Sequence, residues 1–232
     1  MISRNKNAEK VLTPSQLELK PLLEEFNKTH FLVGGTAIAL ELLHRKSLDF
    51  DLFTMETQWT WKQIFERIQK TWLNFNPDLS SKFWFSEEPQ EDIVLFFGEK
   101  NPVKVQFVNF NRDVFGRSYS LFPNKEICWI NTLDIMTLWG LKCFSLMYRT
   151  KRKDIVDLYF IINKKNISLE ELIQTAYYIF GEAYDAKYTL NNICQPETNF
   201  DKTEQVEYII DNPPKDSDIL YNLQQRVYKL FD

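Results

Sequence analysis

Two aspartates, two positions apart, are the first side chains in the sequence with the spacing for chemistry. Asp49 and Asp51 lie in Leu48–Phe53, a run that alternates apolar and acidic residues and predicts a strand. Side chains alternate along a strand, so both carboxylates should share one face. Neighbouring carboxylates repel each other, and a divalent cation is their usual shared ligand. The pattern predicts a Mg²⁺ (or Mn²⁺) site, although surface strands also alternate charged and apolar residues.

Two adjacent glycines precede this strand, in a chain that has six glycines in all. The apolar run Phe31–Val33 reads as a short strand, Gly34 and Gly35 break it, and Thr36 can cap a helix through Ala37–Leu43. A glycine turn that leads into a helix offers free backbone N–H groups to a phosphate. Most Gly-Gly pairs are simple turns, but a phosphate site beside a metal pair suggests nucleotidyl transfer.

These residues together resemble the first motif of the AbiEii/AbiGii-type toxin nucleotidyltransferases, which belong to the polymerase-β-like nucleotidyltransferase superfamily. The motif reads Gly34-Gly35-Thr36, then His44-Arg45-x-Ser47-x-Asp49-x-Asp51-x-Phe53. The resemblance covers about residues 15–165. It implies a toxin of a toxin–antitoxin or phage-defence pair, with a cognate antitoxin as partner and RNA, such as tRNA, as a candidate acceptor.

Side chains around the motif are candidates for binding the nucleoside triphosphate. Arg45 can bind a phosphate bidentately, or it can be a solvated residue at a helix end. Thr36 and Ser47 are further candidates, of which Thr36 is better placed because it follows the glycine pair. His44 is better explained as a structural residue than as a general base.

A lysine lies alone in a long apolar segment later in the chain. Lys142 is the one charged residue between Ile135 and Tyr148. A lysine there is costly unless its amine reaches water or a partner. It can extend its amine to solvent, or direct it at a triphosphate, where a compact positive charge is useful.

Acids and bases alternate directly after that segment. Asp154 and Asp157 are three residues apart and share one helix face, where Arg149 and Lys153 can flank them. Asp154 also suits a helix N-terminus, whereas Asp157 lies deeper in an apolar pattern. The pattern resembles the later motif of the same family, whose lysine and aspartate belong to the active site. The resemblance therefore implies Lys142 and Asp157 as catalytic candidates, and Asp154 and Arg149 as candidates for nucleotide binding.

One position departs from the polymerase-β-like pattern, in which a third carboxylate usually lies on the strand beside the aspartate pair. The best-placed strand here is Val103–Phe110, where Lys104 and Gln106 face outward. Glutamine cannot act as a base. Either Asp157 supplies the third carboxylate, or one metal ion suffices, or the activity is weakened.

Composition excludes several classes of protein. The chain has 232 residues, 44% of them hydrophobic, a net charge of −4 and a pI near 5.4. The acidic balance argues against a broad nucleic-acid surface. The basic cluster at 149–153 is then either a local RNA contact or a solvated turn between two helices. Three widely spaced cysteines, a polar N-terminus and the lack of a long apolar stretch predict a cytoplasmic protein without a membrane span.

Helices and strands mix before about residue 131, and helices dominate after it. We therefore predict an α+β fold: a nucleotidyltransferase-like mixed or antiparallel sheet with flanking helices, followed by a helical half. The expected domains are 1–130, the α+β core, and 131–232, a helical part packed on the active site. We expect a loose arm over 1–12, an irregular segment over 191–214, helices over 13–27, 60–74, 132–149, 153–162, 168–180 and 216–231, and strands over 31–33, 48–53, 82–85, 93–97, 103–110 and 127–130.

The primary prediction is an enzyme that moves a nucleotide from a nucleoside triphosphate to an acceptor hydroxyl. Asp49 and Asp51 would hold Mg²⁺, and Lys142 would neutralise charge on the leaving pyrophosphate. One alternative is a different acceptor, either a small molecule or a protein. Another is a degenerate nucleotide-binding module without turnover, which Gln106 favours.

Overall fold

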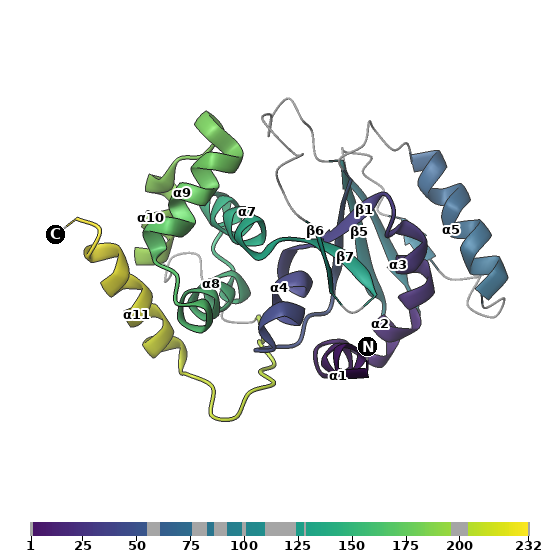
Figure 1. Cartoon of the computed structure of the whole chain (residues 1–232), viewed down its shortest axis with the longest axis horizontal. Coiled ribbons are helices and arrows are strands. Elements are labelled where there is room, and N and C mark those ends of the chain that lie inside the picture. Colours follow the sequence, from purple (N-terminus) through teal and green to yellow (C-terminus); the bar gives the residue numbers. More distant parts are fainter. Residues whose placement is uncertain are drawn as a thin grey trace.

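The computed structural model describes residues 2–54, 61–75, 83–85, 92–98, 101–109, 124–127, 129–195 and 204–231. These residues form a mixed seven-stranded sheet, and helices cover it and extend to one side (Figure 1). The sheet order is β3-β4-β5-β2-β1-β7-β6. The strands are β1 (His30–Val33), β2 (Phe50–Thr54), β3 (Phe83–Phe85), β4 (Asp92–Phe97), β5 (Val103–Asn109), β6 (Asn124–Ile127) and β7 (Ile130–Leu133). The helices are α1 (Ile2–Val11), α2 (Pro14–Glu18), α3 (Lys20–Phe26), α4 (Gly34–Leu42), α5 (Trp61–Phe75), α7 (Ile135–Tyr148), α8 (Arg152–Lys165), α9 (Leu169–Phe180), α10 (Ala186–Cys194) and α11 (Asp216–Tyr228).

The central strands bring the end of β1 beside the aspartate strand. β1 and β2 are antiparallel with Val33 opposite Asp51, and β2 and β5 are parallel with Asp51 opposite Gln106. Strands β3, β4 and β5 form the antiparallel meander that the turn residues between them predict. The predicted α+β class and mixed sheet are confirmed.

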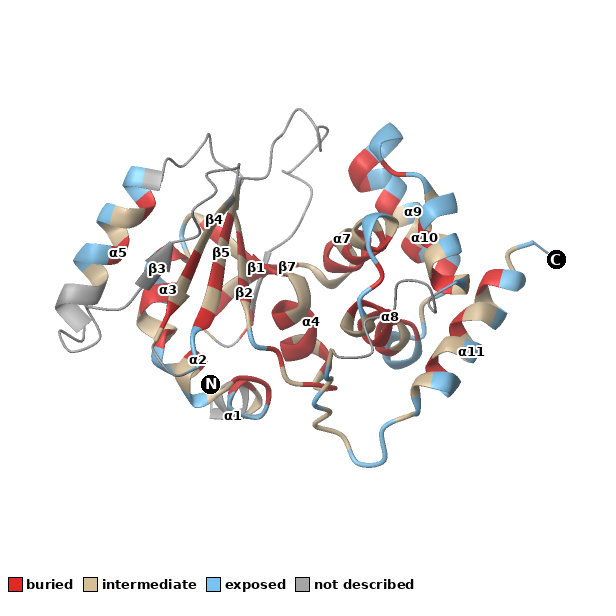
Figure 2. Ribbon diagram, turned by 180° about the vertical axis from the view of Figure 1, so that it is seen from behind, coloured by how far each residue is buried: buried red, intermediate tan, exposed pale blue. Residues whose placement is uncertain are grey.

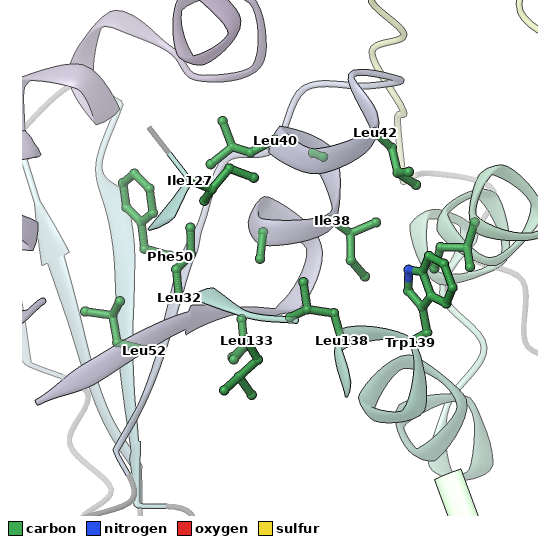
Figure 3. Close-up of a cluster of buried hydrophobic side chains, with 14 of the residues drawn as sticks. Leu32, Ile38, Leu40, Leu42, Phe50, Leu52, Ile127, Leu133, Leu138 and Trp139 are labelled. Carbon is green, nitrogen blue, oxygen red and sulfur yellow. The ribbon is translucent and has the colours of Figure 1, made fainter. Parts of the chain in front are cut away.

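Helix α4 joins the sheet to the helical half of the chain. Six of the nine residues of α4 are buried, and Figure 2 shows a mostly red helix between the sheet and α7 and α8. In Figure 3, Leu32 and Phe50 of the sheet, Ile38 of α4 and Leu138 of α7 lie in one hydrophobic cluster. The core is therefore continuous from the sheet to the helices. The sheet extends to Leu133, and the division of the chain at residue 130 stays a prediction.

The N-terminal segment differs from the expectation in two ways. The arm expected over 1–12 is a helix from Ile2 to Val11, and Ala8 and Val11 in its second half are buried. The single helix expected over 13–27 is broken at Leu19, since Pro21 has no N–H to continue the hydrogen-bond ladder. Thr13 caps α2 in a reciprocal capping box with Gln16.

Two further boundaries need correction. The strand expected over 127–130 is a hairpin of β6 and β7, and the following helix begins after Asp134, whose carboxylate accepts from the N–H groups of Met136 and Thr137. The first residues of the segment expected to be irregular over 191–214 are helical, because α10 continues to Cys194. Within the described ranges, no helix is long and apolar enough to cross a membrane. Cys128 lies outside the described residues.

Candidate active site

Residues from both halves of the chain line one cavity of about 660 Å³. Asp157 does not line the cavity but lies behind it, in contact with two residues that do. The predicted residues that line it are Gly34, Gly35, Thr36, Arg45, Ser47, Asp49, Asp51, Lys142, Arg149 and Asp154. The two motifs, about a hundred positions apart in the chain, therefore meet at a single site.

The helix after β1 begins earlier than expected. Gly34 and Gly35 form the first turn of α4, and Thr36 is not its N-cap, because its hydroxyl bonds instead to the Ser47 hydroxyl (2.7 Å) and to the carbonyl oxygen of Asp49. Thr36 thus ties the first turn of the helix to the segment before β2. The backbone N–H groups of the glycines lie at the helix N-terminus, where they have no partners within the helix.

Both glycines are required by close contacts. Gly34 has a φ of +67°, and a Cβ at this position would lie 2.3 Å from Asp51 Oδ2. A Cβ on Gly35 would lie 2.6 Å from Arg45 Nη2. The turn therefore packs directly on a carboxylate and a guanidinium, and side chains would displace both.

Asp49 and Asp51 face the cavity, but the strand that carries Asp51 begins at Phe50. Leu48 precedes this strand and is 64% exposed. Burial raises the pKa of Asp51 and the charge of Asp49 raises it further, while Lys104 lowers it. A charged Asp51 is thus unfavourable without a cation beside it.

This donor set fits a magnesium ion. Among the described residues, no group of three or more His, Cys, Asp and Glu side chains could hold a metal ion. Mg²⁺ commonly binds one or two protein carboxylates and completes its shell with water and substrate phosphates. A pair of aspartates beside a phosphate-binding turn matches that pattern.

Gln106 lies at the position where the polymerase-β-like pattern usually has a third carboxylate. It is the register partner of Asp51 on β5, and its Oε1 accepts a hydrogen bond of 2.7 Å from Lys104 Nζ. The predicted placement of this strand is confirmed. The strand therefore brings an amide and a cation to the edge of the aspartate pair, not an acid.

Asp157 lies at the centre of a fully buried ion network. Its oxygens accept from Arg45 Nε (2.7 Å) and Nη2 (2.8 Å), and they contact His44 Nε2 (2.9 Å) and Lys142 Nζ (3.0 Å). Burial alone would raise the pKa of Asp157, but Arg45 and Lys142 hold it well below its usual value. A carboxylate has about four acceptor positions, and all four are filled here.

Lys142 does not extend its amine to solvent. It is 5% exposed, and its Nζ donates to Asp154 Oδ1 at 2.8 Å. Arg149 Nε approaches the other oxygen of Asp154 at 3.2 Å, from a side chain that is 51% exposed. Burial would lower the pKa of Lys142, but Asp154 and Asp157 raise it, so the ammonium stays charged.

His44 lies behind the same network. Burial lowers its pKa, its Nε2 contacts Asp157, and its ring packs near Phe160 with 4.9 Å between centroids. Its Nδ1 has no hydrogen-bond partner in the described part of the chain. This environment supports the structural interpretation of His44.

The basic cluster at 149–153 is largely committed to ion pairs. Arg149 pairs with Asp154. Two other cations of the cluster, Arg152 and Lys153, pair with acids from the C-terminal part of the chain. These pairs are Arg152 with Asp216 and Lys153 with Glu204. Lys151 is exposed, but the ion pairs of the other three cations leave the cluster with less free positive charge than its sequence suggests.

Residues 204–210, here called the strap, form a wall of the cavity that sequence reasoning missed. Glu204, Gln205 and Val206 line the cavity. The strap is held by Lys46 N–H to the Glu207 carbonyl (2.8 Å) and by Ile209 N–H to the His44 carbonyl (3.2 Å). The strand-forming residues of 206–210 are the one local signal for this extended contact.

Solved structures of similar fold include nucleotidyltransferases. JHP933 from Helicobacter pylori is 14% identical and superposes with a TM-score of 0.62 over 93% of this chain and 90% of that chain. MenT4, a nucleotidyltransferase toxin from Mycobacterium tuberculosis, is 12% identical with a TM-score of 0.55 over 93% of this chain and 82% of that chain. No curated protein matches the sequence. The fold is that of a nucleotidyltransferase.

The family described as "Nucleotidyl transferase AbiEii toxin, Type IV TA system" matches residues 19–217. The chain therefore belongs to the AbiEii family of nucleotidyl transferase toxins. The resemblance inferred from the two motifs is confirmed, and the match extends past residue 165 to include the strap.

Proposed function

We propose that this toxin transfers a nucleotide from a nucleoside triphosphate to an acceptor hydroxyl, with a divalent cation as cofactor. One observation carries the proposal: a helix N-terminus at a glycine pair, two aspartates and a buried lysine line the same cavity. Phosphates, a metal ion and a leaving pyrophosphate need these three features respectively. These three features come from distant parts of the chain and line one cavity. This arrangement favours a site for nucleotidyl transfer over the alternative that the charged residues are only solvated surface groups.

Each residue has a role that follows from its position. The N–H groups of Gly34 and Gly35 bind the phosphates, and Arg45 beside them adds a fixed positive charge. Asp49 and Asp51 hold Mg²⁺ or Mn²⁺, which when bound supplies Lewis-acid stabilisation of the phosphoryl oxygens. The acceptor hydroxyl attacks the α-phosphorus in line, its proton leaves to solvent, and pyrophosphate departs.

Two further cations that line the cavity act on the leaving group. Lys142 and the half-exposed Arg149 place positive charge where pyrophosphate develops negative charge. Asp154 fixes both of them by its two oxygens. Asp157 contacts Arg45 and Lys142 from behind, so we assign it as a positioning residue and not as the third metal ligand.

The candidate acceptor is an RNA, and the candidate protein partner is a cognate antitoxin, as the toxin family implies. The net charge is −4, and ion pairs leave little free positive charge in the 149–153 cluster. This favours recognition of a short RNA end over a long duplex, since each phosphate contact requires a free cation.

A transfer assay tests the function. Purified protein is incubated with each α-labelled nucleoside triphosphate, Mg²⁺ and total cellular RNA, beside the double variant Asp49→Asn, Asp51→Asn. We expect label on RNA with the wild type and none with the variant. Label that persists in the variant would contradict the assigned metal site.

A nucleotide-binding module without turnover is the second candidate, because Gln106 occupies the register position beside Asp51. This candidate predicts triphosphate binding without transfer in the wild type. It also predicts that Gln106→Glu, which supplies the third carboxylate, creates measurable transfer. If the wild type transfers the nucleotide to a small molecule or to a protein and not to RNA, the assignment of RNA as the acceptor is wrong.

A further inference from the structure

The cavity has a wall that the proposed chemistry leaves unused. Leu138, Leu141 and Phe144 of α7, here called the apolar wall, line the same cavity as the glycine pair and the aspartates. The cavity thus has a polar part and an apolar part. Ligand sites of this composition bind molecules that combine a polar group with an apolar body.

The sequence of α7 explains why charge and apolar surface adjoin. Leu138, Leu141 and Phe144 recur every three residues and so form a stripe along one helix. Lys142 of the same helix also lines the cavity. The apolar wall therefore begins next to the ammonium that we assign to the pyrophosphate.

Close helix packing fixes the main side chain of the wall. A Cβ on Gly140 would lie 2.5 Å from Ile179 Cδ1, so α7 and α9 approach closely at this glycine. The approach stacks Phe180 on Phe144, with 4.0 Å between ring centroids and 21° between ring planes. Phe144 is thus positioned before any ligand arrives, which lowers the entropy lost on binding.

We propose that the nucleobase of the bound nucleoside triphosphate packs on the apolar wall, with Phe144 as its main contact. This inference rests on the proposed function: phosphates at Gly34 and Gly35 leave the nucleoside to occupy the rest of the cavity. The volume of about 660 Å³ falls within the usual range for small-molecule sites. Base faces stack readily on aromatic side chains, whatever the base.

Binding measurements with two probes separate the wall from the phosphate site. Isothermal titration in Mg²⁺ compares nucleoside triphosphates with inorganic tripolyphosphate, which has no base. We expect Phe144→Leu, which keeps an apolar side chain but removes the ring, to weaken binding of nucleoside triphosphates roughly 10- to 100-fold, the range of one lost base–aromatic stack. Affinity for tripolyphosphate should stay within about twofold, and Phe144→Tyr should restore nucleotide binding.

Tyr178→Leu is the matched control, because Tyr178 lies on α9 near Phe180 but is 62% exposed and does not line the cavity. It should bind both probes as the wild type does, and melting curves verify that each variant is folded. Nucleotide binding unchanged by Phe144→Leu, or an equal loss for both probes, would overturn the apolar wall as the base site. A wild type that binds no nucleoside triphosphate would overturn the proposed function and the inference together.

Discussion

Asp51 is a carboxylate whose charge the fold disfavours in the absence of a cation. Its pKa is raised by burial first and by Asp49 second. We expect Asp51→Asn to raise the free energy of unfolding of the metal-free protein by about 0.5–2 kcal/mol, the usual gain from removing an unfavourable charge, while it abolishes transfer. Chemical denaturation in a chelator measures the gain.

The same substitution gives a test with pH and with metal. A raised folded-state pKa means that the folded state binds more protons, so stability falls as pH rises from about 4 through the raised pKa of Asp51. Asp51→Asn should remove this decline. Mg²⁺ or Mn²⁺ should raise the melting temperature of the wild type and leave the variant unchanged. Equal stabilisation of both by metal would place the cation elsewhere.

Asp157 is the opposite case, a buried acid that its partners keep ionised. Asp157→Asn leaves Arg45 and Lys142 buried with too little negative charge, so we expect the free energy of unfolding to fall by about 3–5 kcal/mol. Arg149→Ala should cost less than about 1 kcal/mol, because that side chain is half exposed. Urea titration compares them.

Asp157→Asn also separates positioning from metal binding. Because the pKa of Asp157 is held low, its stabilisation of the wild type is present at neutral pH and is lost only as pH falls well below 4. If Asp157 positions cations, Mn²⁺ affinity should be unchanged in a folded Asp157→Asn sample, while tripolyphosphate affinity drops. A loss of Mn²⁺ binding would instead make Asp157 a metal ligand.

Helix α4 is the element on which the site depends, because its first turn contacts Asp51 and Arg45. Gly34→Ala forces a Cβ into Asp51 and strains a positive φ. We expect a loss of about 1–2 kcal/mol in stability from the backbone and roughly 100-fold in transfer from the displaced carboxylate. Melting curves and the transfer assay measure the two effects.

Gly181→Ala is the control for this prediction. Gly181 also has a positive φ, of +55°, but a Cβ there would meet nothing within 4 Å. It should show a similar loss of stability and normal transfer. Normal transfer by Gly34→Ala as well would mean that the contact with Asp51 does not matter for activity.

Sequence reasoning succeeded where the signal was local. The glycine pair and the spacing of Asp49 and Asp51 depend on neighbouring residues, and the structure places each near its expected position. Thr36 was assigned to the wrong partner because Ser47 and the Asp49 carbonyl reach it from outside its helix. Rules based on the spacing of residues along one helix or strand cannot predict a contact between separate elements.

Long-range contacts explain most of what was missed. Asp157 and Arg45 are 112 positions apart, and the family resemblance alone linked their motifs. Helix α1 has few apolar residues, so its burial against the rest of the core was invisible in its pattern. The strap was missed because an isolated extended segment becomes ordered through its partners, here the backbone of 44–46.

At the scale of the whole molecule, the strap connects the C-terminal part of the chain to the site. Glu204 accepts from the Lys153 N–H (3.1 Å) and pairs with its Nζ (3.2 Å), near the N-terminus of α8. We expect Glu204→Ala to cost about 1 kcal/mol, as loss of a helix cap does, and to speed hydrogen exchange at the Ile209 N–H. Denaturation and exchange measurements test both effects.

Glu207→Ala provides the comparison within the same segment. Glu207 is exposed and pairs with Lys46, so its loss should cost less than about 1 kcal/mol and change exchange little. If the two variants behave alike, the half-buried carboxylate of Glu204 is not what anchors the strap.

The strap also sets the order in which the site is completed as the chain is made. Asp49 and Asp51 are synthesised early. The strap, which lines the same cavity, is complete only when residue 210 has been synthesised. A nascent chain therefore carries the aspartates for most of its translation without the cavity around them. Under the proposed function, synthesis of this toxin is therefore almost complete before the site for nucleotidyl transfer is fully enclosed.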